Sequence, residues 1–133
     1  MEYKSVNKEL TDYIKDKIFP EYAKNDKGHG ILHILEVIRR SFELKESLNL
    51  DYLDDDMIFA IASCHDNGKY IDHKTHEKIA AERFYANQEF KKFFRDEQRK
   101  IIKEAIATPS ITFTNINITS KISLWSFEVI MEN

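Results

Sequence analysis

The sequence contains little that would interrupt or crosslink a chain. Its single cysteine, Cys64, excludes an internal disulfide and is typical of a reducing compartment. Three glycines and two prolines among 133 residues give few turn signals, so we expect long helices. No stretch approaches the roughly 20 apolar residues of a membrane span, and residues 1–4 have no apolar signal core. These features predict a cytoplasmic protein with no membrane partner.

An excess of basic residues is also missing. The formal net charge is -3, whereas proteins that bind nucleic-acid polymers usually carry a clear positive excess, so we expect no such partner. A small anionic substrate remains compatible with this charge, because a metal ion and a few local Lys or Arg residues can supply a positive field. A chain of 133 residues fits a single domain with one core.

Hydrophobic spacing predicts five helices. They are expected at about residues 6–23, from about 29 to beyond 44, and at 54–64, 75–86 and 96–107. Pro20 should end or kink the first helix, and Asp96 is a candidate N-cap of the fifth. Residues 57–64 are almost wholly apolar, so we expect this part of the third helix to be buried.

Residues 108–133 differ in character from the rest of the chain. The segment 109–119 alternates β-branched and polar residues in a pattern typical of a strand. Acidic residues are absent from 105 to 127, and the last stretch has neither helix caps nor a regular period. We therefore expect a helical domain over residues 1–107 and an irregular, atypical tail over residues 108–133.

A polar pair, His65-Asp66, directly follows the apolar run of the third helix. Imidazole and carboxylate side chains can bind one divalent cation if the backbone turns, and Gly68 would permit such a turn. Polar side chains beside a buried helix are costly unless they are paired or coordinate an ion. In the alternative interpretation, His65 caps the carbonyls of the helix and Asp66 lies in solvent.

All five histidines lie between residues 29 and 76, around this pair. His29 and His33 are four residues apart and could share a helical face, although His29 could instead cap the helix. His33 has apolar neighbours and is the better candidate ligand. We expect His76 to face the same site, and His73 to lie in a solvated loop.

These motifs, in this order, resemble the HD superfamily of metal-dependent phosphohydrolases, and most closely its small stand-alone bacterial members. The similarity covers about residues 18–106. Its motifs are Asn25-Asp26, Gly28-His29-Gly30, His33-Ile34, Val37-Ile38, His65-Asp66-Asn67-Gly68-Lys69 and His76-Glu77.

The resemblance implies a compact all-α bundle and a divalent metal, namely Mn²⁺, Mg²⁺, Fe²⁺, Co²⁺ or Ni²⁺. It implies that His33, His65 and Asp66 are the metal ligands. It further implies that Lys69 contacts the substrate phosphate, and that His29 and His76 line the substrate pocket.

The implied chemistry is hydrolysis of a nucleotide or a small phosphate ester by a metal-activated water. Asp66 would hold the metal and help to orient or deprotonate the water, while Lys69 would offer a point charge to the phosphate oxygens. His29 or His76 would donate a proton to the leaving oxygen, and the sequence does not choose between them.

One expected ligand is missing, because the family completes its site with an Asp from a late helix. No Asp follows Asp96, and Glu128 and Glu132 are the only carboxylates after Glu104. Three explanations compete. The metal site could use three residues and water, or the domain could be a degenerate module that binds metal or nucleotide without turnover. In the third, residues 108–133 are truncated or translated out of frame.

Two further hypotheses, on the oligomeric state and on a purely structural role, stay open. A misread or missing final helix would leave apolar surface uncovered, and a homo-oligomer is one way to cover it. Besides an enzyme and a binding module, the chain could be a purely structural helical domain. In that case the clustering of the histidines would be due to chance.

Overall fold

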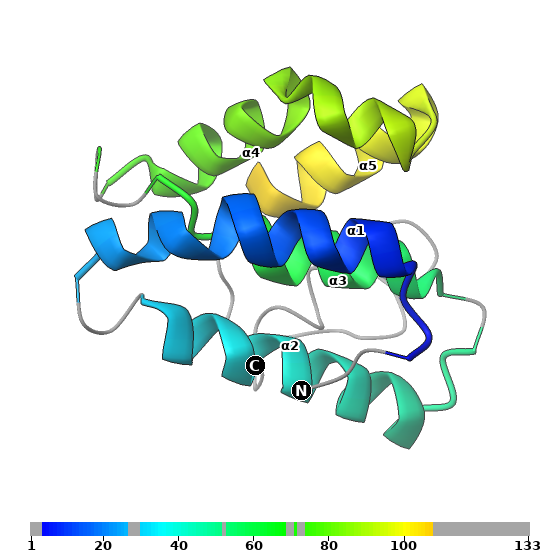
Figure 1. The fold of residues 1–133 in the computed structure, drawn as a ribbon. Coiled ribbons are helices and arrows are strands. Elements are labelled where there is room, and N and C mark those ends of the chain that lie inside the picture. Colours follow the sequence, from blue (N-terminus) through cyan, green and yellow to red (C-terminus); the bar gives the residue numbers. More distant parts are fainter. Residues whose placement is uncertain (1–3, 27–29, 52, 69–70, 72–73, 108–133) are drawn as a thin grey trace.

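The computed structural model describes residues 4–26, 30–51, 53–68, 71 and 74–107, and over these residues the chain forms a compact all-α bundle (Figure 1). The elements are α1 (Lys8–Tyr13), the π-helix η1 (Ile14–Ile18), the 3-10 helix η2 (Phe19–Lys24), α2 (Ile31–Ser47), α3 (Asp55–Cys64), α4 (His76–Ala86), the 3-10 helix η4 (Gln88–Lys92) and α5 (Asp96–Ala107). The predicted all-α bundle is confirmed. The predicted tail, residues 108–133, lies outside the described residues.

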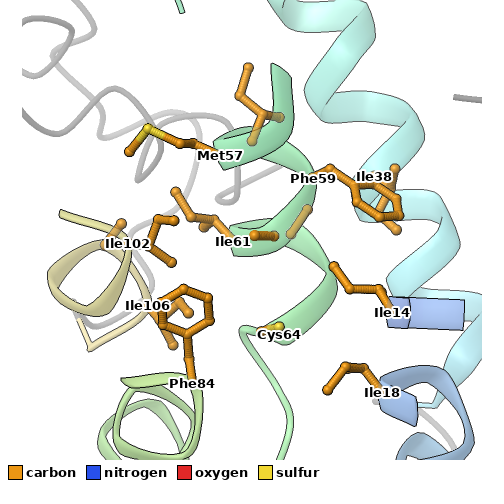
Figure 2. Close-up of a cluster of buried hydrophobic side chains, with 14 of the residues drawn as sticks. Ile14, Ile18, Ile38, Met57, Phe59, Ile61, Cys64, Phe84, Ile102 and Ile106 are labelled. Carbon is orange, nitrogen blue, oxygen red and sulfur yellow. The ribbon is translucent and has the colours of Figure 1, made fainter. Parts of the chain in front are cut away.

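Helix α3 is the centre of the bundle. It contacts α2, α4, α5 and η1, and Figure 1 shows it behind α1, between α2 and the α4–α5 pair. All residues from Met57 to Cys64 are buried, as predicted from their apolar character. In Figure 2, side chains of α3 lie between those of α2 and η1 on one side and those of α4 and α5 on the other. The labelled residues are Ile14, Ile18, Ile38, Met57, Phe59, Ile61, Cys64, Phe84, Ile102 and Ile106.

The acidic run before α3 caps the helix. Asp54 is the N-cap, and its Oδ1 accepts hydrogen bonds from the backbone N–H groups of Asp56 (2.8 Å) and Met57 (3.2 Å). Asp55 forms an ion pair with Lys45 of α2. Asp56 Oδ1 accepts a hydrogen bond of 2.8 Å from the backbone of Asn7. These carboxylates therefore join α3 to α2 and to the start of α1.

The first predicted helix is helical almost throughout, but its hydrogen-bonding pattern changes twice. α1 passes into the π-helix η1, in which the N–H of Phe19 bonds the carbonyl of Ile14, and then into η2, with Pro20 in its first turn. Buried side chains recur at every fourth position, at Leu10, Ile14, Ile18 and Tyr22. In a regular α-helix such positions drift by about 40° per step. The wider π turn offsets this drift at the step from Ile14 to Ile18, and all four side chains are buried in the core.

Asp96 was expected to cap α5, but it is instead the first residue inside that helix. The carbonyl of Arg95 accepts the first helical hydrogen bond, from Arg99 N at 2.9 Å, so Arg95 is the capping residue. The side chain of Gln98 accepts a hydrogen bond from the N–H of Arg95, also at 2.9 Å. Asp96 bonds Tyr85 (3.1 Å) and Arg99 (2.9 Å), which joins α4 to α5.

Within the described part of the chain, none of the helices has the length and apolar character that a bilayer crossing requires.

Candidate metal centre

The candidate site begins where α3 ends, because the last carbonyls of a helix need partners from outside it. The carbonyl of Ser63 accepts a hydrogen bond of 2.5 Å from the hydroxyl of Tyr22 in η2. The carbonyl of Cys64 accepts one of 3.1 Å from the N–H of Asn67. Burial raises the pKa of the Tyr22 hydroxyl well above its ordinary value of 10.0, so the hydroxyl stays a donor at physiological pH. The turn after α3 is thus anchored to η2.

Gly68 allows the turn, as predicted. Its φ of +118° lies in the region that favours glycine. A Cβ atom at this position would lie 2.7 Å from Cγ2 of Ile79 and 3.4 Å from Cδ of Arg83, both on α4. Two features therefore require glycine at position 68: its backbone conformation and the close approach of α4.

The ring of His65 is fixed by a hydrogen bond of 2.8 Å between its Nδ1 and the carbonyl of Ala62. A carbonyl can only accept, so Nδ1 carries the proton, and Nε2 of the neutral ring keeps a lone pair for a ligand. Such a contact on the second nitrogen is the usual companion of a metal-binding histidine. The alternative interpretation is therefore confirmed for His65, which caps a carbonyl of α3, but is wrong for Asp66, whose side chain is only 4% exposed.

His33, His65 and Asp66 converge as predicted. Nε2 of His33 lies 3.5 Å from Oδ2 of Asp66, and Nε2 of His65 lies 3.6 Å from the same oxygen. One ligand atom from each residue lies within 4.8 Å of the other two, so the group could hold a metal ion. The residues present therefore fit a divalent metal in both donor type and spacing.

The second oxygen of Asp66 faces α4. Nε2 of His76 lies 3.3 Å from Oδ1 of Asp66 and 3.3 Å from Oε1 of Glu77. The His76 side chain is 14% exposed and belongs to the first turn of α4. The structure thus brings His76 to the site by contact with Asp66, and its predicted role in substrate binding stays a prediction. Glu77 was part of the motif but had been given no role.

Other predicted site residues lie outside the described residues. These are His29 and Lys69, as well as the loop residue His73. The sole cysteine is close to the site in sequence but is not a candidate ligand. Burial raises the pKa of Cys64 to about 12, so it is a protonated thiol within the core.

Asn25 belongs to the site, although no role was predicted for it. Its Nδ2 donates a hydrogen bond of 2.9 Å to the main-chain carbonyl of Asp66, 41 positions later. For Asn25, the only available signal was its place in the motif Asn25-Asp26. For Tyr22, the signal was a tyrosine among otherwise aliphatic buried positions, because a buried hydroxyl needs a hydrogen-bond partner.

Comparison with known proteins does not identify the chain. No family model matches it, and neither a curated protein nor a solved structure matches it significantly. The evidence for function is therefore the site itself and the motifs that form it.

Proposed function

We propose that the chain is a metal-dependent phosphohydrolase of the HD superfamily that acts on a nucleotide or another small phosphate ester. The observation that carries this proposal is the convergence of His33, His65 and Asp66, with both imidazole Nε2 atoms 3.5–3.6 Å from one carboxylate oxygen. Two of these ligands come from one end of α3 and the third from α2, so the fold itself brings them together.

His33, His65 and Asp66 would hold the metal. Two imidazole nitrogens and one carboxylate favour Fe²⁺, Co²⁺ or Ni²⁺ over Mg²⁺ and Ca²⁺, which prefer oxygen ligands. A bound divalent ion would supply Lewis acidity toward a phosphoryl oxygen and a nucleophile at neutral pH. Asp66 would orient the attacking water, while His76 contacts the second carboxylate oxygen of Asp66.

The phosphate contact is assigned to Lys69, and the remaining pocket contact to His29. The proposal also includes a cytoplasmic location, because the fold has no disulfide that would depend on an oxidising compartment. No nucleic-acid polymer or membrane is proposed as a partner. The net charge of -3 argues against a nucleic-acid polymer and is compatible with a small phosphorylated substrate, because a metal ion and local basic residues can supply the positive field.

A second candidate function is a non-catalytic module that binds a metal or a nucleotide. The absence of any Asp after Asp96 favours it, because the expected late ligand is not in the sequence. Three protein ligands with water would still hold an ion, and they would bind it more weakly than four.

The test has two parts. Protein purified without chelator is analysed for its metal content, and phosphate release is then measured on a panel of nucleotides and small phosphate esters with Mn²⁺, Mg²⁺, Co²⁺ or Ni²⁺. The wild type is expected to contain near-stoichiometric transition metal and to hydrolyse at least one substrate. His33→Ala and Asp66→Asn should lose both properties. Asp12→Asn, which alters an exposed carboxylate paired with Lys8, is the matched control and should keep both.

The outcomes separate the two candidates. Bound metal without turnover on any member of the panel would support the binding module and reject the enzyme. A wild type that neither contains nor takes up metal and binds none of the nucleotides in the panel, with unchanged stability in His33→Ala, would reject both.

A further inference from the structure

The segment from Tyr22 to Asp26 lies between the two elements that carry the candidate ligands. On the α3 side it makes two hydrogen bonds, one from the Tyr22 hydroxyl to the carbonyl of Ser63 at the end of α3 (2.5 Å) and one from Nδ2 of Asn25 to the carbonyl of Asp66 in the turn that follows (2.9 Å). The second bond is made to the main chain of a candidate ligand itself.

The same segment also contacts the start of α2. Gly30 caps this helix and precedes His33 by three residues. A Cβ atom built at Gly30 would lie 3.9 Å from the carbonyl oxygens of both Tyr22 and Asp26, so this segment runs close beside the start of α2. Helices η2 and α2 contact each other as well. One short segment therefore touches the helix that carries His33 and bonds the turn that carries Asp66.

We propose that Asn25 is a positioning residue for the metal site and that Tyr22 anchors the segment that carries it. The inference rests on the proposed metal-binding function. His33 and Asp66 come from different helices, and their 3.5 Å separation depends on how α2 and the turn after α3 are held relative to each other. Asn25 fixes the turn at the ligand residue, and the Tyr22 and Asp26 backbone fixes the start of α2.

The local structure of Asn25 holds its backbone in place, so its side chain can bond the carbonyl of Asp66. Its backbone N–H bonds the carbonyl of Tyr22 at 3.1 Å and closes η2, which holds the residue in an extended conformation. The partner oxygen is a carbonyl and can only accept, so the amide nitrogen must be the donor. Without this bond, the peptide after Asp66 keeps the bond from Asn67 N to the carbonyl of Cys64 on its N–H side, but its carbonyl side can shift and widen the ligand group before any ion binds. Loss of such outer contacts typically weakens metal affinity by 10–100-fold.

The experiment is a titration of the full chain with Co²⁺, with the visible absorbance of the ion as the readout, alongside thermal unfolding of the metal-free protein. Asn25→Ala is expected to weaken Co²⁺ binding about tenfold or more. The matched control is Asn87→Ala. Asn87 also donates from Nδ2, to Tyr13 at 2.8 Å, and also caps a helix, but it lies between α4 and η4. This control should lower the melting temperature and leave the Co²⁺ affinity within about twofold of the wild type.

Tyr22→Phe is the second variant and should weaken Co²⁺ binding less than Asn25→Ala, because its bond is made to α3, three residues before Asp66. Equal Co²⁺ affinity in the wild type and Asn25→Ala would overturn the positioning role and leave the metal site intact. Equal weakening in Asn25→Ala and Asn87→Ala would also overturn it, since the effect would then be general destabilisation. A wild type that binds no Co²⁺ would overturn the proposed function and this inference together.

Discussion

Helix α3 has carboxylates at both ends, and the two ends use them differently. At the N-terminal end, Asp54 and Asp56 accept hydrogen bonds of 2.8–3.2 Å from backbone N–H groups, and Asp55 pairs with Lys45. These are ordinary hydrogen-bond lengths. The positive end of the helix dipole also favours negative charge there. This end already has backbone donors for two of its carboxylates and a cation, Lys45, for the third.

At the C-terminal end, the carboxylate of Asp66 faces three imidazole nitrogens at 3.3–3.6 Å, which is longer than ordinary hydrogen bonds. It is nearly buried and lies just beyond the negative end of the helix dipole, where negative charge is disfavoured. Imidazole nitrogens gathered around one nearly buried carboxylate are donor types that suit a divalent cation. Hydrogen-bond length and burial thus distinguish the capping carboxylates from the candidate ligand at the other end of the same helix.

The C-terminal end depends on its turn, so the largest effect is expected from Gly68→Ala. A Cβ atom would sit 2.7 Å from Ile79 Cγ2 in a backbone conformation that alanine rarely adopts. Strain and overpacking together should cost about 2–4 kcal/mol of unfolding free energy. Chemical denaturation would measure it.

Gly30→Ala is the control for this substitution. Its nearest neighbours would be 3.9 Å from the new Cβ, so the expected cost is about 1 kcal/mol or less, from the weaker cap alone. Similar losses in the two variants would contradict the account of the turn.

The second prediction separates the two ends by their response to metal. Co²⁺ at a concentration of 100 times its dissociation constant should stabilise the wild type by about 2.7 kcal/mol. Asp66→Ala should abolish this gain, because it removes the carboxylate shared by both histidines, whereas Asp54→Ala should keep it. Differential scanning calorimetry with and without Co²⁺ measures both. Loss of the response in Asp54→Ala would show that the two ends are not independent.

Much of this arrangement could be predicted from the sequence because it is local. The apolar run of α3 leads directly into His65-Asp66, so burial and polar chemistry adjoin in the sequence, and Gly68 marks a turn by its residue type alone. The spacing of His33 with apolar neighbours indicated its place on α2, although its side chain is still 37% exposed.

Contacts that depend on tertiary packing could not be predicted. Apolar spacing does not distinguish an α-helical from a π-helical hydrogen bond, so the change at Ile14 was missed. Asn25 looks like any turn residue until η2 docks against the end of α3. Asp96 resembles a cap in sequence, but Tyr85 and Arg99 draw its side chain to the α4–α5 contact.

A smaller effect is expected at the N-terminal end from Asp54→Ala. The substitution leaves the N–H groups of Asp56 and Met57 without their cap and should cost about 1 kcal/mol. Asp54→Asn keeps an acceptor oxygen and should recover most of the loss. Urea denaturation of the pair measures the difference, and equal losses would mean that charge rather than capping is the dominant contribution.

The smallest effect concerns Asp56, at the N-terminal end of α3, and it is the pH dependence of the unfolding free energy. Burial raises its pKa above the ordinary 3.8, the hydrogen bond from Asn7 opposes this, and Asp54 and Asp55 add repulsion. A carboxyl whose pKa is raised by folding binds more protons in the folded state. Its contribution to stability is therefore present below the unfolded pKa and is lost as the pH rises through the folded pKa.

Asp56→Asn keeps an acceptor for the Asn7 N–H and removes the charge. At neutral pH it should stabilise the protein, by less than about 0.5 kcal/mol because solvent screens this partly exposed group. The gain should fade as the pH falls through the folded pKa of Asp56 toward 3.8. Unfolding curves across this range, with Asp12→Asn as the exposed control, would measure it. A gain that grows toward acidic pH would show that ionised Asp56 stabilises the fold, as a capping carboxylate does, and that the three aspartates do not strain one another.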